Sequence, residues 1–372
     1  MHSSPMRSTI RRPTESIARC LALLAFCSAS AAAQDEPLKD PLCQASAEGD
    51  RAQVQVLLRN GADPNVRDEK SHTPLMYAAS LRGRSERRTP KQIQPDYLGV
   101  ATLLLARHAD PNARDESGRT PLLLAMEGSA SEYRVIGADE EMVRLLIARG
   151  ANVNAQDHDG WSALLMAAKL WADQPKLIPL LLASRADVNA RLKDGRTALM
   201  LAVRLGKTDR LAILLANRAE VNAADGEGAT ALMNAAVVTW EDAALELMKL
   251  LLAKGADPNV ADKKGKTAAD RAADAGYLDR ATYLLAHEAR TLDQVAFLKN
   301  ARNRALVRAI LSGSIEAARG LLEQGADPDS RDDVGRTVLM IACDNEYSAD
   351  KAILLLDRRA SVDSVGANGD TA

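Results

Sequence analysis

Along most of this chain, apolar residues recur three and four positions apart in short stretches that polar phrases separate. One stretch carries Val54, Leu57 and Leu58, and another carries Leu211 and Leu214. Because an α-helix turns once in about 3.6 residues, this spacing places the apolar side chains on one helix face. The pattern predicts a chain of short amphipathic helices with turns between them.

The polar phrases are copies of one another, and each copy has a Thr or Ser twelve residues after its first residue. The copies read GADPNVRDEKSHTPLM from Gly61, HADPNARDESGRTPLL from His108, GANVNAQDHDGWSALL from Gly150, RADVNARLKDGRTALM from Arg185, RAEVNAADGEGATALM from Arg218, GADPNVADKKGKTAAD from Gly255, GADPDSRDDVGRTVLM from Gly325 and RASVDSVGANGDTA from Arg359. Degenerate stretches at 40–43 and 304–307 occupy the same frame. The spacings are then 33, 47, 42, 35, 33, 37, 37, 33 and 34 residues, which indicates a period of 33 with insertions.

This pattern resembles the ankyrin repeat family, since Gly-Ala-Asp-x-Asn, Gly-x-Thr-Pro-Leu and Leu-Leu recur in register over residues 40–372. The resemblance implies an all-α solenoid of about nine stacked antiparallel helix pairs joined by β-hairpin loops, with an incomplete last unit. It also implies a non-catalytic scaffold or regulatory module that binds a protein partner through hairpin tips, inner helices and inserted loops.

Two other functions stay open at this point. The chain stops at Thr371 and Ala372, where another inner helix would begin. The repeats could therefore be the targeting or regulatory part of a longer enzyme whose catalytic domain lies beyond residue 372. A solenoid without a capping unit could also self-assemble through its last layer.

The recurring residues make physical sense in such a fold. Thr or Ser can accept a hydrogen bond from a free backbone N–H at the start of the inner helix. Pro74 and Pro121 follow at the first helical position, where a missing N–H costs nothing. The small residues of the run 75–79 let the next layer approach closely. Asp-Gly steps at 159–160 and 194–195 suit tight turns at the hairpin tips.

The sequence departs from the family's pattern at two positions. In place of the usual His after Thr-Pro-Leu, the chain has Cys43, Met76, Leu123, Leu165, Met200, Met233, Asp270, Val307 and Met340. We expect a softer apolar contact there instead of a buried polar tie. At the position after the outer helix where Gly is favoured, the chain has His108, Arg185, Arg218, Glu288 and Arg359 in five copies. Each is expected to cost about 1 kcal/mol of local strain.

Composition agrees with many thin layers rather than one large core. Hydrophobic residues make up 47% of the chain, but aromatic residues make up only 3%. The apolar content is almost all Ala, Leu, Val and Met, with Ala expected where layers touch and Leu within each layer. Lys and Arg number 48 against 50 Asp and Glu, so the chain lacks the basic excess of a nucleic-acid-binding protein.

Residues 1–33 differ from the rest of the chain. Four Arg residues are followed by the uncharged run 20–33, which ends in a small-x-small cleavage site. This order predicts a secretory signal peptide, a short linker over 34–39 and a periplasmic or secreted protein. A retained N-terminal anchor or a lipoprotein at Cys27 are the alternatives, although bulky Phe26 stands where a lipoprotein has a small residue. No later stretch is long and apolar enough to span a bilayer, so no membrane insertion is expected after cleavage.

No constellation of catalytic residues stands out. The His residues that follow the signal segment lie at hairpin tips or helix ends in different layers: His72, His108, His158 and His287. There is no Cys-x-x-Cys, His-Glu-x-x-His or phosphate-binding Gly-rich loop, so we predict no enzyme, no cofactor and no metal site. The repeated Asp and Asn residues are interpreted as ties of each turn's own backbone rather than as calcium ligands.

Two cysteines remain after the signal segment. Cys43 and Cys343 fall at helix positions that the repeat frame buries, which favours packing over redox chemistry. Because eight stacked layers separate them by tens of ångströms, no intramolecular disulfide is expected.

The insertions are candidates for partner specificity. The unit that begins at Thr73 carries about 14 extra residues around 82–95, a basic stretch that includes Arg84, Arg87 and Arg88. It is interpreted either as a solvated loop or as a contact for an acidic partner or anionic surface. A second insertion covers 128–139.

Aromatic rings are the other candidates. Trp240, Tyr277 and Tyr347 lie ten residues after the Thr of their units, and Trp171 lies nine after its Ser. These rings fall in the turns between paired helices, where they could contact a partner or pack against neighbouring turns. Trp161 lies in a hairpin frame that we expect to be exposed, and it is the strongest single candidate for a partner contact.

Overall fold

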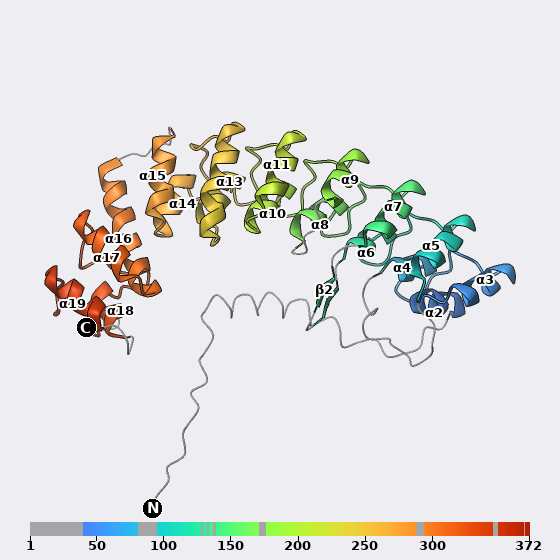
Figure 1. Ribbon diagram of the computed structural model, residues 1–372, viewed down its shortest axis with the longest axis horizontal. Helices are drawn as coiled ribbons and strands as arrows, with labels where there is room; N and C mark the ends of the chain where they lie inside the picture. Colours follow the sequence, from blue (N-terminus) through green and yellow to red (C-terminus); the bar gives the residue numbers. More distant parts are fainter. Residues whose placement is uncertain are drawn as a thin grey trace, which may run out of the picture.

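The structure is a computed structural model, and it describes residues 40–80, 95–127, 129–131, 134–136, 139–170, 176–287, 294–344, 349–367 and 369–372. The predicted signal peptide and linker lie outside these residues. Most of the chain forms short helices that follow one another in pairs (Figure 1). The pairs are α2 (Pro41–Glu48) with α3 (Arg51–Arg59), α4 (Pro74–Ala79) with α5 (Tyr97–Ala106), α6 (Pro121–Met126) with α7 (Glu140–Ala148), α8 (Ala163–Lys169) with α9 (Leu177–Ala183), α10 (Ala198–Arg204) with α11 (Thr208–Ala216), α12 (Ala231–Val237) with α13 (Glu241–Ala253), α14 (Ala268–Asp274) with α15 (Leu278–Ala286), α16 (Gln294–Ser312) with α17 (Ile315–Glu323) and α18 (Val338–Cys343) with α19 (Ala349–Asp357).

The pairs stack side by side into an arc (Figure 1). The first helix of each pair lies on the concave side and contacts the first helix of the next pair, from α2 through to α18. The second helix of each pair lies on the convex side, so the two rows are called the inner and outer helices below. This arrangement is the helical solenoid that the sequence predicts.

A short two-stranded sheet adds to the helical pattern. β1 (Ser129–Ser131) and β2 (Arg134–Ile136) pair antiparallel between α6 and α7, with Ala130 opposite Val135. This sheet lies in the second predicted insertion and extends from the concave side of the arc (Figure 1). Isolated β-bridges also close three hairpin loops, between residues 191 and 197, 224 and 230, and 331 and 337.

All the inner helices except α16 begin where the sequence predicts, because a short polar side chain caps the first turn. The Thr73 hydroxyl accepts a hydrogen bond from the Met76 N–H at 3.3 Å. In the degenerate first unit, Asp40 performs this role and accepts from the N–H groups of Leu42 and Cys43 at 2.8 and 3.0 Å. The same cap recurs at Thr120, Ser162, Thr197, Thr230, Thr267 and Thr337.

The unit around α16 departs from this rule. The repeat frame predicts an inner helix that starts at Arg304, but α16 begins at Gln294 and runs through that position for 19 residues. Arg304 has no short side chain that could cap a helix start. Its guanidinium instead donates from Nη1 to the Asp274 carbonyl at 3.2 Å and to Asp333 Oδ1 at 2.8 Å, so it links the pairs on either side.

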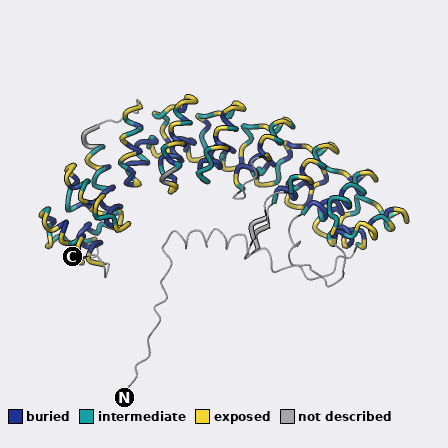
Figure 2. Tube along the Cα trace, viewed as in Figure 1, coloured by how far each residue is buried: buried dark blue, intermediate teal, exposed yellow. Residues whose placement is uncertain are grey.

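Buried residues recur in every pair and form the core (Figure 2). One cluster of buried apolar residues runs from Leu42 in α2 to Ala301 in α16, and a second runs from Leu306 in α16 to Ala360. Within one layer, large and small buried residues occur together, as at Leu75, Ala78 and Ala79 of α4. The core is therefore a series of thin layers, as the Ala- and Leu-rich composition predicts, and it divides at α16.

The residue after each outer helix has a left-handed backbone. Its φ is +87°, +88°, +84° and +88° at Gly61, Gly150, Gly255 and Gly325. Where the sequence has a side chain, φ is smaller, with values of 66°, 66°, 67° and 63° at His108, Arg185, Arg218 and Arg359. These residues therefore move toward the left-handed well that a Cβ tolerates best. Glu288, the fifth exception, lies outside the described residues.

Asparagine side chains join consecutive units. Asn154 Nδ2 donates to the Arg185 carbonyl at 3.1 Å, and its Oδ1 accepts from the Asp187 N–H at 2.8 Å. The same pair of bonds is made by Asn65, Asn112 and Asn222. Asp187, by contrast, closes its own turn by accepting from the Asn189 N–H at 2.9 Å. The prediction that both residue types tie only their own turn is thus right for Asp187 and incomplete for Asn154, and Asp329 also accepts from the next unit, at the Ser361 N–H.

The hairpin tips are joined as well, by backbone hydrogen bonds. The His158 N–H donates to the Ser117 carbonyl at 2.9 Å, and the Lys193 N–H donates to the Asp159 carbonyl at 3.2 Å. Gly226 continues the series, since its N–H donates to the Asp194 carbonyl at 2.7 Å. A ladder of peptide groups therefore runs across the hairpins and holds neighbouring units in register.

Replacing Asn154 by Ala should weaken the junction between the third and fourth units. Two hydrogen bonds to the next unit are lost while the apolar core stays intact, so the free energy of unfolding should fall by about 1–2 kcal/mol. Urea unfolding followed by circular dichroism measures this change.

The matched control is Asn217→Ala, since the Asn217 amide donates only to the Ile213 carbonyl of its own helix. This variant should stay within about 0.5 kcal/mol of the wild type. Equal losses in the two variants would contradict a coupling role for Asn154.

Candidate functional site

On the inner side of the arc, one side-chain contact between a hairpin and the end of an inner helix recurs in several units. In four units, the residue before the capping Thr or Ser contacts the residue eight positions further along the chain, at the end of the inner helix. Arg119 pairs with Glu127 at 3.1 Å, and Arg336 pairs with Asp344 at 3.0 Å. Lys266 forms the equivalent ion pair with Asp274. The hairpins and inner helices therefore share one surface of mostly neutralised charges.

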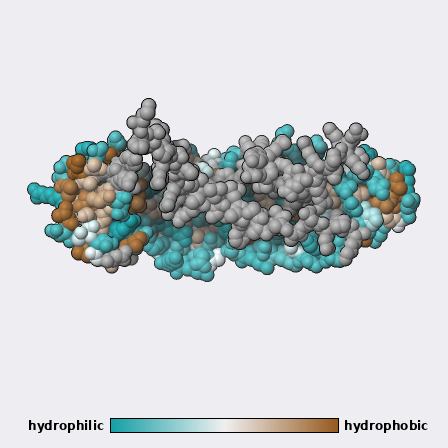
Figure 3. All heavy atoms as spheres, turned by 90° about the horizontal axis from the view of Figure 1, so that it is seen from below, coloured by the Kyte–Doolittle hydropathy of each residue, from teal (hydrophilic) through white to brown (hydrophobic). Residues whose placement is uncertain are grey.

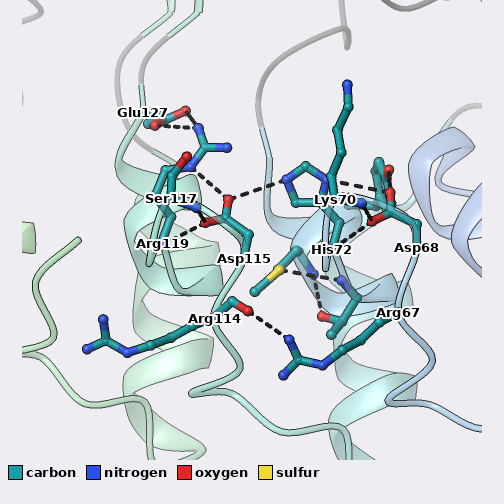
Figure 4. Close-up of polar contacts among 12 residues, drawn as sticks. Arg67, Asp68, Lys70, His72, Arg114, Asp115, Ser117, Arg119 and Glu127 are labelled. Atoms are coloured by element: carbon teal, nitrogen blue, oxygen red, sulfur yellow. Dashed lines mark hydrogen bonds and ion pairs between the residues drawn. The ribbon is translucent and has the colours of Figure 1, made fainter. Parts of the chain in front are cut away.

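The densest part of this surface joins the first two hairpin loops (Figure 4). His72 lies between two carboxylates, with Nε2 at 3.3 Å from Asp115 Oδ2 and Nδ1 at 3.6 Å from Asp68 Oδ2. Arg119 Nε donates to Asp115 Oδ2 at 2.8 Å, and the Tyr77 hydroxyl donates to Asp68. The Asp115 side chain is only 1% exposed, so this carboxylate depends on its protein partners.

Several hairpin carboxyl groups have pKa values below their ordinary range. Burial alone would raise the pKa of Asp68, but hydrogen bonds from the Tyr77 hydroxyl and the His72 N–H outweigh burial and lower this pKa below its ordinary value. The pKa values of Asp262 and Asp332 are also lowered, because hydrogen bonds and a charged partner outweigh burial. The charged partners are Arg271 and Arg336, respectively. Within the described residues, no group of three or more His, Cys, Asp or Glu is placed to hold a metal ion.

Three buried cations were not predicted from the sequence. Arg210, Arg280 and Lys351 are 4%, 1% and 9% exposed. Each donates to backbone carbonyls at the end of the preceding inner helix, as when Arg280 Nη1 donates to the Val238 carbonyl at 2.7 Å and Lys351 Nζ to the Ile310 carbonyl at 3.2 Å. A cation is favourable at this negative end of the helix dipole. The signal was a basic residue eight positions before the residue that follows the outer helix, where most other units have an apolar one.

Tyr277 illustrates how a ring can pack between turns. The guanidinium carbons of Arg280 and Arg308 lie 3.7 and 3.5 Å from the centre of its ring, and the residue is 9% exposed. Tyr277 is therefore enclosed by cations of its own chain, and its ring leaves little surface for a partner.

The two described tryptophans lie differently. Trp161 is half-buried against the core, whereas its hairpin frame predicts exposure, because the ring lies back along α8 with the Lys169 ammonium 4.5 Å from its centre. Trp240 is 42% exposed, and its Nε1 donates to the Arg204 carbonyl at 3.2 Å. A Cβ built on Gly206 would lie 3.0 Å from the Trp240 ring, so this ring packs on the turn of the preceding unit.

The remaining candidates lie outside the described residues: Arg84, Arg87, Arg88, Trp171 and Tyr347. The partner role predicted for these residues stays a prediction.

The cysteines follow the prediction only in part. Cys43 is fully buried, and burial, together with the nearby Asp40 and Asp68 carboxylates, raises the pKa of its thiol to about 12. Cys343 is exposed, which corrects the expected burial, because in the described part of the chain no further inner helix covers that end of α18. The two residues belong to helices at opposite ends of the arc (Figure 1).

The expected loss of a polar tie at the family's His position also needs correction. Asp270 restores a polar tie, since its Oδ2 accepts from the Thr267 N–H at 2.9 Å. The Met76 sulfur accepts from the Thr73 N–H at 3.4 Å, which is a weak polar contact rather than a purely apolar one.

Comparison with known proteins identifies the fold. A model of ankyrin repeats in three copies matches residues 93–191, 165–244 and 238–332, and a single-repeat ankyrin model matches residues 39–69. These matches cover more than half of the chain, so the protein belongs to the ankyrin repeat family, whose repeats are protein–protein interaction modules. No curated protein matches the chain. Among the described helices, none has both the length and the apolar character needed to cross a membrane.

The lowered pKa of Asp262 predicts a loss of stability in acid. A carboxyl whose folded pKa lies below its unfolded pKa stabilises the fold above about pH 4, and this contribution is lost as the pH falls through the folded pKa. The Asp262→Asn variant should be less stable than the wild type by about 1–3 kcal/mol at pH 7, because the anion that binds Arg271 is missing. The difference should shrink below about pH 4, as measured by urea unfolding at pH 7, 4 and 3.

Asp357→Asn, which removes an exposed carboxyl at the end of α19, serves as the control for a changed net charge. A deficit of Asp262→Asn that stays constant over the whole pH range would show that the pKa assignment is wrong.

Proposed function

We propose that this protein is a non-catalytic scaffold or regulatory protein of nine helix pairs that binds another protein on the inner side of its arc. Membership in the ankyrin repeat family supports this proposal, because such repeats are interaction modules. The observation with most weight is the continuous surface of hairpins and inner helices, held rigid by the Asn links and the ladder of hairpin tips.

Rigidity matters for this function. A preformed surface lowers the entropy cost of binding, since few of its groups become ordered on association. The paired charges on this surface, such as Arg119 with Glu127, already have partners. They therefore contribute to the shape of the binding surface more than to electrostatic attraction for a partner. Unneutralised cations and rings between these pairs are the groups that can distinguish one partner from another.

We also propose that the protein acts in the periplasm or outside the cell. The basic start, apolar run and small-residue cleavage site of residues 1–33 support export with removal of this segment. The binding surface would then face proteins of the envelope or the surroundings.

Affinity capture from the envelope fraction of the source cells tests the binding proposal. The protein should retain a reproducible partner, and Trp161→Ala should lower the recovered amount at least tenfold if this ring contacts the partner. Tyr283→Ala, which removes a ring from the outer helix α15, should leave recovery unchanged. Failure of the wild-type protein to retain any partner would count against the proposal.

Expression of the whole chain in a bacterium tests the location. The protein recovered from the periplasm should begin at Gln34, as read by N-terminal sequencing, because cleavage is expected after Ala33. A variant with Arg at positions 31 and 33 should keep its signal segment. Recovery of the wild-type protein from the cytoplasm with residues 1–33 attached would contradict export.

A further inference from the structure

The pairing of hairpin and helix end is broken in the middle of the arc. Toward both ends, a cation before the capping residue meets a carboxylate at the last helical turn, as in Arg119 with Glu127 and Arg336 with Asp344. In the α8 and α10 units, the equivalent helix-end residues are Lys169 and Arg204. A cation thus stands where the α6, α14 and α18 units have an anion.

Within the described part of the chain, Lys169 and Arg204 are exposed and neither forms an ion pair. The hairpin partner of Lys169 is the Trp161 ring, which attracts a cation without cancelling its charge. The hairpin partner of Arg204 would be Arg196, but this guanidinium already binds Asp194 at 2.6 Å. The described side chains therefore give the centre of the inner side a local positive charge, in a chain of net charge −2.

The geometry sets the shape of a matching ligand. The inner helices α8 and α10 are in contact, so equivalent residues on them are about 10 Å apart. An extended peptide in the polyproline II conformation has about three residues per turn and rises about 3.1 Å per residue, so carboxylates three residues apart lie on one side, about 9 Å from each other, and would reach both cations. The Trp161 ring and the half-buried Met166 offer an apolar contact beside them.

We propose that the central inner surface, defined as Trp161, Lys169 and Arg204, binds an extended acidic segment of the protein partner. This inference rests on the proposed function and adds the chemical class of the ligand. Two partner carboxylates bind the two cations, and an apolar residue next to them covers the Trp161 ring.

Peptide selection tests the proposal without knowledge of the natural partner. The full chain is immobilised, and a random library of 12-residue peptides on phage is selected against it. The enriched peptides should be acidic, with Asp or Glu three residues apart. Binding of the most enriched peptide, measured by fluorescence anisotropy, should weaken at least tenfold in Lys169→Glu/Arg204→Glu and should weaken with added salt.

The control is Arg59→Glu/Lys254→Glu, which makes the same charge change at the ends of outer helices and should bind like the wild type. A milder variant, Lys169→Gln/Arg204→Gln, repeats the test if circular dichroism shows that the charge reversal disturbs folding. Enrichment of neutral or basic peptides, acidic peptides insensitive to both variants, or tighter binding of a labelled single-stranded oligonucleotide would overturn this inference alone. Absence of any enriched peptide would count against the proposed function as well.

Discussion

Each helix pair of this protein has an apolar face that only the next pair can bury, and the rest of the structure follows from this constraint. The layers are thin, so Ala is placed where inner helices touch and Leu within each pair, as at Ala78 and Leu75. Because the core is a series of contacts between neighbours, the polar groups must also be satisfied between neighbours. The Asn bonds and the ladder of hairpin tips are how this requirement is met.

The same constraint explains the buried cations. Short inner helices end close to the next outer helix, so their last carbonyls would be left without partners in an apolar layer. Arg210, Arg280 and Lys351 reach these carbonyls from the following pair. Tyr277 then stacks between Arg280 and Arg308, so a ring that the sequence marks as a possible binding residue becomes part of the packing.

On the inner side, charged side chains that are paired within a unit differ from those that keep their charge for recognition. Where the hairpin residue and the helix end form an ion pair, as in Arg119 with Glu127, most of the charge is cancelled within one unit. Where Lys169 replaces the carboxylate, the cation keeps its charge above the Trp161 ring. A repeat protein can thus vary its recognition surface at positions that do not alter the stacking of its layers.

The sequence alone determined the repeat, its period, the capping residues and the left-handed positions, because these depend on local backbone geometry that recurs in every copy. It could not show that α16 continues through the frame at Arg304, or that Cys343 is exposed, since both depend on what the neighbouring units supply. The sequence predicted Trp161 as a candidate from its place in the repeat, but it did not predict the surroundings of this ring. Only the folded chain places the Lys169 ammonium over the ring. Contacts between units join residues 30 to 50 positions apart in the sequence. Because insertions change this separation from one unit to the next, only the tertiary structure determines which residues meet.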